Sequence, residues 1–266
     1  MSDFHQLIIA GTLTGAVRAM RDGARGTLTS AFARVDRTTG VPRYEQLVLT
    51  LETTAPHLAR QLISHAAGDR LLVLGQLEAR QVEQVEHATR TERGVPVVVR
   101  VRHPTLVLVI GQIVPLLRTD AASVRDLQQL TIAGNLRETV QRAADGTATG
   151  TVITRFTRID LTAGLPVHER LALPLEASDP YHAQQFCQFR SGTRVLAIGH
   201  LEPRFRTHTV RASAADGSGA VRVETTTTLL VMVLEHLLVA GADADRTHTA
   251  DRMDEAARPA SGYPPQ

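Results

Sequence analysis

Arginine and aromatic side chains that alternate along the chain are its best candidates for chemistry. Phe205 lies between Arg204 and Arg206, and the sequence has no lysine, so all 29 of its basic residues are arginine. A guanidinium binds phosphate oxygens in pairs and stacks on flat rings, while an aromatic side chain stacks on an unpaired base. A high arginine content can also follow genomic base composition. The alternation of the two residue types nevertheless favours contact with single-stranded nucleic acid.

Other arginines lie in or beside two polar segments, Gln81 to Gly94 and Phe205 to Ala220, which we call the first and second arms. Glutamates dilute the positive charge of the first arm, whereas only Asp216 opposes it in the second. We therefore rank the second arm as the stronger contact, although a charged run is more often a solvated face. Each phosphate that is neutralised adds to the salt dependence of binding. The predicted phosphate contacts are Arg80, Arg90, Arg93, Arg100, Arg102, Arg204, Arg206, Arg211 and Arg222.

Aromatic side chains make up only 3% of the sequence, and none is tryptophan. Tyr44 is the best single stacking candidate, with packing against the protein surface as an equal alternative. Phe205 is favoured for stacking because of its arginine neighbours. Phe32 and Phe156 are further stacking candidates, but they fall inside predicted strands, where packing in the core is the favoured alternative.

No constellation typical of an enzyme or a metal site occurs in the sequence. The 11 histidines never have His-x-x-x-His spacing, and Cys187 is the single cysteine, which excludes a Cys-x-x-Cys pair. The segment Gly11 to Gly15 lacks the lysine of a phosphate-binding loop, and Gly-x-Ser-x-Gly is absent. We therefore predict a non-enzymatic protein with no cofactor and no bound metal.

The bulk properties predict a soluble, cytoplasmic protein. The formal net charge is only +2, and the single cysteine fits a reducing compartment. Asp3 and His5 interrupt any signal segment, and the longest apolar runs, Leu106 to Ile110 and Leu229 to Leu234, are too short to span a bilayer. No membrane partner is expected.

The elements that must position these side chains occur twice. Gln6 to Gly11 returns 123 residues later as Gln129 to Gly134, and Val73 to Glu78 returns 124 residues later as Ala197 to Glu202. This period is much longer than the roughly 50 residues of solenoid repeats. The chain therefore contains a duplicated domain, and each half is expected to have the same fold.

Within each half, periodicity predicts three strands, a helix and two further strands. In the first half the strands are expected over Leu7–Leu13, Thr27–Val35, Tyr44–Leu51, Leu71–Leu77 and Val95–Val114. This is the element order of the OB-fold, a five-stranded Greek-key barrel whose helix lies between the third and fourth strands. The predicted fold class is all-β with one short helix per domain, in two tandem OB-fold barrels.

The helices are expected to begin at polar caps. Thr54 is predicted to cap the first helix, with Leu58, Leu62 and Ala66 as its buried stripe. The second helix is predicted to open at Ser178, Asp179 and Pro180. The predicted domains are residues 1–114 and 127–240, joined by a linker over 115–126 and followed by a disordered tail over 241–266.

The repeated residues also resemble a known family. Leu7 to Leu13 and Leu130 to Leu136, the latter ending in Gly-Asn-Leu, resemble the opening strand of bacterial single-stranded DNA-binding proteins. Gly68 to Leu77 and Ser191 to Leu201 resemble the glycine turn and fourth strand of that family. Two such units in one chain resemble its tandem form, in which two chains supply four OB domains.

The resemblance implies a protein that coats and protects unpaired DNA during replication, recombination or repair, without strong sequence preference. It also implies association with the nucleoid, a homodimer with four OB domains, and replication or repair proteins as possible partners. The family tryptophan near the start of the third strand corresponds to Tyr44 in the first half and to His168 in the second, so His168 joins the stacking candidates.

Two departures from the family favour a different class of function. The family stacks bases on several aromatic side chains that are missing here, and its acidic tail ends in Pro-Phe, whereas this chain ends in Tyr263-Pro264-Pro265-Gln266. The alternative function is an OB-fold interaction or structural module with little or no DNA binding. A domain for structured RNA is a weaker third possibility, because it rests on the arginine content alone.

Overall fold

The computed structural model describes residues 3–35, 39–89, 96–116, 126–159, 165–213 and 220–239. Within these ranges, the side chains of residues 35, 82–89, 96–103, 159, 208, 210–213 and 220–225 are not described. The predicted tail over 241–266 and most of the predicted linker over 115–126 lie outside the described residues.

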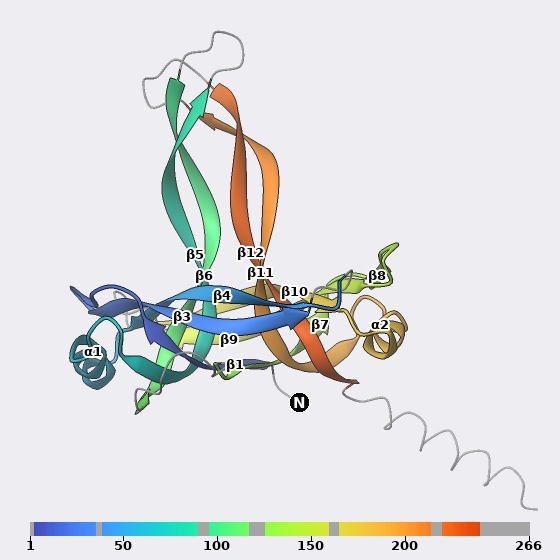
Figure 1. The fold of residues 1–266 in the computed structure, drawn as a ribbon, viewed down its shortest axis with the longest axis horizontal. Coiled ribbons are helices and arrows are strands. Elements are labelled where there is room, and N and C mark those ends of the chain that lie inside the picture. Colours follow the sequence, from blue (N-terminus) through green and yellow to red (C-terminus); the bar gives the residue numbers. More distant parts are fainter. Residues whose placement is uncertain are drawn as a thin grey trace, which may run out of the picture.

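The first half forms a closed five-stranded barrel with one helix (Figure 1). β1 pairs with β3 and β5, β4 pairs with β3 and in parallel with β6, and β5 pairs with β6. Each barrel strand therefore has two neighbours, and closure removes the exposed edges of an open sheet. The elements are β1 (Phe4–Leu13), β2 (Arg18–Met20), β3 (Gly23–Val35), β4 (Pro42–Thr53), α1 (Pro56–Ile63), β5 (Arg70–Thr89) and β6 (Pro96–Leu116).

The second half repeats the same pairings, with β7 closing on β9 and β11, and β10 joining β9 to β12. This confirms the predicted fold class of two tandem OB-fold barrels, because each helix lies between the third and fourth barrel strands. The elements are β7 (Gln128–Leu136), β8 (Gln141–Arg142), β9 (Ala148–Ile159), β10 (Pro166–Ala177), α2 (Pro180–Phe186), β11 (Arg194–Ser213) and β12 (Ala220–Val239).

The two barrels share one continuous 12-stranded sheet because β1 pairs antiparallel with β7. Leu7 lies opposite Leu130, which is its own equivalent 123 residues later, and both side chains are 0% exposed. Two equivalent strands therefore meet about a pseudo-two-fold axis. This is the isologous geometry that two copies of a subunit normally make.

Equivalent side chains also cross between the halves. Asp3 binds Arg194 at 2.6 Å and accepts a hydrogen bond from a main-chain N–H of β9 at 3.0 Å. Asp126, its equivalent, binds Arg70 and accepts a hydrogen bond from a main-chain N–H of β3 at 2.7 Å. The two sets of contacts are reciprocal, so they fix the orientation of each barrel on the other.

Two long hairpins, β5–β6 and β11–β12, project from the barrels in the same direction (Figure 1). They include most of the predicted arms, which are continuations of the barrel strands and not separate polar segments. The register shifts between Leu74 and Gly75 of β5, where the pairing skips Gly111 of β6, and equivalently between Ile198 and Gly199 of β11, where it skips Glu235 of β12. The extra residue marks a bulge in β6 and in β12. A bulge bends a strand and increases its twist, which redirects it toward the arm.

The helices differ from the prediction at the first cap and in the buried stripe. Ala55, not Thr54, is the N-cap of α1 and makes no side-chain capping bond, and the helix ends at Ile63. Ala66 therefore lies beyond the helix and is exposed, and Ala59 completes the buried stripe instead. Asp179 does cap α2, because its side chain accepts hydrogen bonds from the backbone N–H groups of the next turn.

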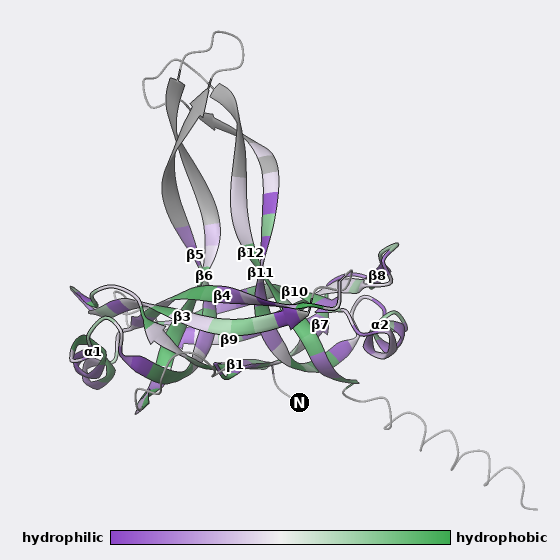
Figure 2. Cartoon of the chain, in the orientation of Figure 1, coloured by the Kyte–Doolittle hydropathy of each residue, from purple (hydrophilic) through white to green (hydrophobic). Residues whose placement is uncertain are grey.

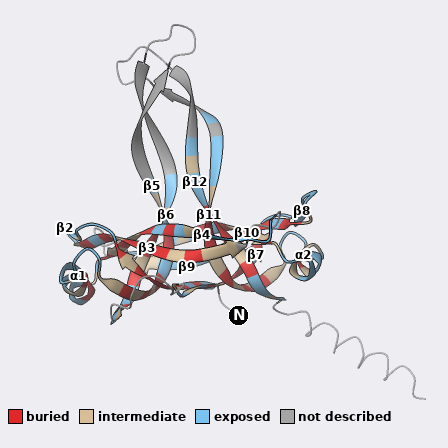
Figure 3. Ribbon diagram, in the orientation of Figure 1, coloured by how far each residue is buried: buried red, intermediate tan, exposed pale blue. Residues whose placement is uncertain are grey.

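Apolar residues alternate with polar ones along the barrel strands, and the buried positions follow the same alternation (Figures 2 and 3). One cluster of buried side chains runs through both barrels, from Leu28 and Leu49 in the first to Leu173 and Phe186 in the second. In contrast, the described residues at the base of the arms are mostly exposed (Figure 3). Among the described residues, no helix is long and apolar enough to span a membrane.

Candidate nucleic-acid interface

The outer face of β3 and β4 is the part of the first barrel that an OB-fold offers to a ligand. Because side chains alternate along a strand, Leu47 and Leu49 point into the core, whereas Tyr44 and Val48 point outward and are 79% and 58% exposed. Tyr44 lies opposite Ala33, whose small side chain leaves the ring uncovered. An exposed ring in this place can stack on a base.

The equivalent face of the second barrel, on β9 and β10, carries charged and polar groups. His168 occupies the position of Tyr44; it is exposed, and its Nδ1 is hydrogen-bonded to Thr157 Oγ1 at 2.9 Å. Arg155 and Arg170 lie directly opposite each other on the two strands, and both are exposed. Neither arginine is among the contacts predicted from the sequence, because the two come from different strands and neither lies near an arm.

Phe205 lies where β11 leaves the barrel for the second arm, and its side chain is 77% exposed. Its strand partner is Thr228, and the next residue, Arg206, is also exposed. The structure therefore places an uncovered ring at the base of the arm, with Arg206 projecting from the opposite face of the same strand.

Phe32 and Phe156 occupy equivalent positions that face inward. Phe32 is 8% exposed and belongs to the hydrophobic core. Phe156 is half-buried and packs edge-on against His5 of the first half, with ring centroids 5.1 Å apart. Burial also lowers the pKa of His5, despite its hydrogen bond to the Leu77 carbonyl. The burial of both phenylalanines supports core packing, which is the favoured alternative to base stacking.

Arg80 and Arg204, both predicted phosphate contacts, are held in equivalent ion-pair clusters at the base of the arms. Arg204 binds Glu202 at 2.6 Å and Glu176 at 3.1 Å. Arg80 binds Glu78 at 2.5 Å and lies 3.6 Å from a carboxylate oxygen of β4. A phosphate would therefore compete with these carboxylates for each guanidinium.

The second of these clusters joins the two halves. Glu202 is 4% exposed and also lies 3.6 Å from Arg34, which comes from the β3–β4 hairpin of the first barrel. Burial would raise the pKa of Glu202, but the hydrogen bonds from His200 and Arg204 and the charges of Arg204 and Arg34 lower it to about 2. The hydrogen bond to Glu202 raises the pKa of His200, although burial lowers it. Glu235 on β12 lies 2.8 Å from the His200 ring and raises this pKa further.

The side chains of the remaining predicted phosphate contacts lie outside the described residues. Arg90 and Arg93 lie outside the described residues. The other four lie on the strands of the two arms, and their side chains are outside the description; they are Arg100, Arg102, Arg211 and Arg222.

A groove of about 300 Å³ lies on the outer face of the second barrel, at the end of β9 and β10 that is remote from Arg170. Its lining includes Pro174, Glu176 and Glu138, and the Glu138 carboxylate accepts a hydrogen bond from Thr151 at 2.8 Å. The positive charge of this face is therefore concentrated at the end near the β9–β10 hairpin.

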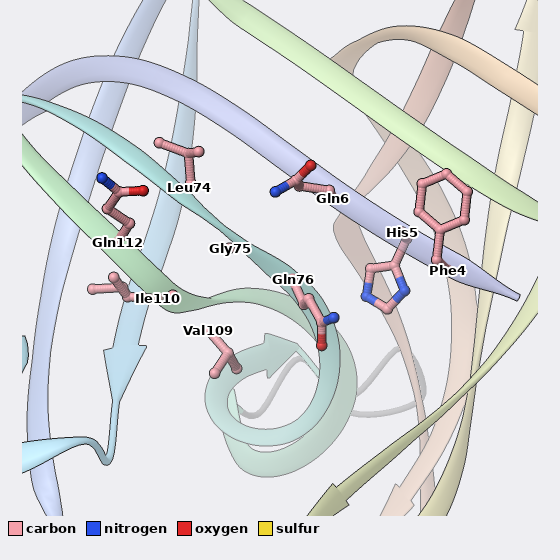
Figure 4. A pocket seen from close by; sticks show the side chains of 10 residues that line it. Phe4, His5, Gln6, Leu74, Gly75, Gln76, Val109, Ile110 and Gln112 are labelled. Atoms are coloured by element: carbon pink, nitrogen blue, oxygen red, sulfur yellow. The ribbon is translucent and has the colours of Figure 1, made fainter.

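A second cavity, of about 540 Å³, lies in the first half between β1, β5 and β6, beside Gly75 and the bulge at Gly111 (Figure 4). Glutamine amides from all three strands line it, together with the buried ring of His5. Among the described residues, no group of three or more His, Cys, Asp or Glu side chains could hold a metal ion, there or elsewhere. The cavity offers amide hydrogen bonds but no catalytic pair.

No protein-family model and no curated protein sequence matches the chain. Among solved structures, the wild-type single-stranded DNA binding protein from Thermus aquaticus is similar over 100% of this chain and 98% of its own, with a TM-score of 0.55 at 16% identity. A deletion mutant of the same protein matches with a TM-score of 0.56, also at 16% identity and with the same coverage.

The chain has the tandem OB-fold architecture of that protein. Because the match covers essentially all of both chains, it includes both barrels and their order along the sequence. In this architecture the outer faces of β3–β4 and β9–β10, together with the two arms, are the surfaces on which a ligand of an OB-fold is expected.

Proposed function

We propose that this protein binds single-stranded DNA, as a passive and non-enzymatic coat without strong sequence preference. The observation that carries the proposal is that Tyr44 and Phe205 are the two most exposed large apolar side chains among the described residues, at 79% and 77%. Both are aromatic, and both lie on an OB-fold ligand surface. Uncovered rings in these places are what sequence-independent stacking on bases requires.

Stacking and charge act on different parts of the strand. Tyr44 and Phe205 contact base faces, which every base presents, so binding does not depend on sequence. Arginines bind phosphates and release counterions, so binding weakens as salt is added. Bases held in this way cannot pair, and the protein therefore competes with reannealing of the duplex.

The direct test is a titration of a fluorescent oligo-dT strand, and of a duplex of equal length, at two salt concentrations. We expect micromolar or tighter binding of the single strand, weaker binding of the duplex, and loss of affinity at the higher salt concentration. If the chain does not bind the single strand even at low salt, the proposal is wrong, and an OB-fold interaction module becomes the better account.

Single substitutions test the assignment of the rings. Replacing Tyr44 or Phe205 by Ala should weaken binding of the single strand by about 5- to 150-fold, because stacking on one base contributes about 1–3 kcal/mol. Tyr181→Ala is the matched control, since Tyr181 is 63% exposed but lies on α2, away from the ligand surfaces. Equal losses for all three variants would contradict the assignment.

We further propose that the protein acts as a homodimer with four OB barrels at the nucleoid, where it protects unpaired DNA during replication, recombination or repair. The resemblance of the sequence to the tandem single-stranded DNA-binding proteins supports this, as does the likeness in fold. Replication or repair proteins are the partners that the resemblance implies. Light scattering on the purified protein should give the mass of two chains, and the mass of one chain would contradict the dimer.

A further inference from the structure

The ligand faces of the two barrels differ in charge at equivalent positions. The opposed pair Arg155 and Arg170 on β9 and β10 corresponds, 124 residues earlier, to the opposed pair Ala31 and Gln46 on β3 and β4. The fold therefore does not require a charge at either position. Something other than barrel stability must account for two arginines on the second face.

The arrangement of these arginines is unfavourable without a ligand. Residues directly opposite each other on antiparallel strands have Cβ atoms about 4.5–5.5 Å apart, and like charges in such pairs are destabilising. Within the part of the chain that the structure describes, neither guanidinium has an ion-pair or hydrogen-bond partner. Two exposed guanidinium groups that repel each other form a site for an anion with several oxygens, which each can bind bidentately.

Among the described residues, two carboxylates that adjoin the pair are already engaged elsewhere. Glu169 precedes Arg170 on β10, but it points to the other side of the strand and binds Arg158. Asp3 accepts a hydrogen bond from the main-chain N–H of Arg155, but its other carboxylate oxygen binds Arg194 at 2.6 Å. The acidic lining of the groove belongs to the opposite end of the face. The anion is therefore expected near the β9–β10 hairpin.

We propose that the two faces hold a single strand in different ways, the first barrel by stacking at Tyr44 and the second by binding phosphates at Arg155 and Arg170. The inference rests on the proposed binding of single-stranded DNA and assigns stacking and phosphate binding to different faces, β3–β4 and β9–β10. Phe205 lies on β11, outside the β9–β10 face, and stacks at the base of the second arm. Duplication preserved the fold, and the copies then diverged into a face that contacts bases and a face that contacts the backbone.

The experiment measures the slope of log affinity against log salt concentration for a fluorescent oligo-dT strand. The test variant combines Arg155→Ala and Arg170→Gln, which installs the residues that the first half has at these positions and is therefore compatible with the fold. The control variant combines Arg60→Gln and Arg190→Gln, which removes two exposed charges near the helices. Tyr44→Ala completes the set, and circular dichroism confirms that each variant is folded.

We expect the slope for the test variant to become shallower by about 1.4, because each phosphate contact to a single strand contributes about 0.7. The control variant should keep the slope of the unaltered protein. Tyr44→Ala should lose affinity by about 5- to 150-fold with an unchanged slope, because stacking releases no counterions.

Two other results would overturn the inference, and they are distinguishable. If the unaltered protein binds the strand but the test variant and the control variant have the same slope, Arg155 and Arg170 do not bind phosphates, and the proposed function stands. If the unaltered protein shows no binding at low salt, both the proposed function and the inference fall.

Discussion

Buried glutamates bind the arginines at the base of each arm and so limit their availability to a ligand. Glu78 and Glu202 are both 4% exposed and occupy equivalent positions, and each binds the arginine two residues later on its strand. A carboxylate removed from water needs such a partner, because an unpaired buried charge is strongly destabilising. Arg80 and Arg204 therefore stabilise the barrel even without a ligand, whereas Arg155 and Arg170 neutralise no buried carboxylate among the described residues.

The ion-pair cluster on β11 predicts a specific dependence of stability on pH. The pKa of His200 in the folded protein is raised above its ordinary 6.5, so the histidine stabilises the fold fully below pH 6.5 and loses this effect as pH rises through the raised pKa. His200→Gln should therefore destabilise the protein more at about pH 6 than at about pH 9. Urea unfolding at the two pH values measures the difference between the two proteins, and a difference that does not change with pH would contradict the role of His200.

At the scale of the elements, a glycine allows each arm to leave its barrel. A Cβ atom at Gly75 would lie 2.2 Å from the carbonyl oxygen of Val109, and one at Gly199 would lie 1.9 Å from that of Val233. Both glycines lie opposite the bulge of the neighbouring strand, where its backbone approaches too closely for any side chain. This is the physical reason why the Gly of each repeated Leu-Gly or Ile-Gly pair is present in both halves.

Gly75→Ala should lower the free energy of unfolding by about 1–3 kcal/mol, because backbone must move to admit the methyl group. Gly111→Ala is the control: Gly111 is the extra residue of the bulge in β6, but the nearest atom to its Cβ would be 3.6 Å away, which is ordinary contact. Urea unfolding of both variants checks the expectation. Equal effects would show that the close approach at the bulge does not restrict position 75.

The whole molecule is a symmetric pair of barrels built from one chain. The β1–β7 pairing buries Leu7 against Leu130, and the reciprocal contacts of Asp3 and Asp126 clamp it on either side. The two aspartates are not equally buried, since the Asp126 side chain is 3% exposed and that of Asp3 is 18% exposed. Their contributions to stability should differ accordingly.

Asp126→Ala should destabilise the protein by about 3–5 kcal/mol, because it leaves Arg70 as an unpaired, largely buried charge. Asp3→Ala makes the equivalent change in the other half. It should lower the free energy of unfolding by less, because water can reach Arg194, whose side chain is 27% exposed. Thermal unfolding of the two variants shows which substitution destabilises the protein more. A larger loss for Asp3→Ala would show that burial does not set the strength of these contacts.

The sequence by itself determined the fold. The repeat, the apolar alternation and the single helical stretch in each half suffice for two OB barrels, because each is a local pattern that reports which side of a strand is buried. The sequence pattern also assigned different roles to Phe32 and Phe205, because Phe32 falls within a predicted strand, where core packing is favoured, and Phe205 lies between two arginines. The same local reasoning misplaced the first helix cap at Thr54, because side-chain propensity alone does not fix the residue at which the backbone turns.

Only the tertiary structure decided which charged side chains are available to a ligand. Arg204 is engaged by Glu176, which lies 28 positions earlier, and Arg155 stands opposite Arg170 because β9 and β10 pair in one particular register. Charge pairing acts through space over a few ångströms, so residues far apart along the chain determine it. The sequence shows how many arginines the protein has, and the fold determines which of them remain free of carboxylates.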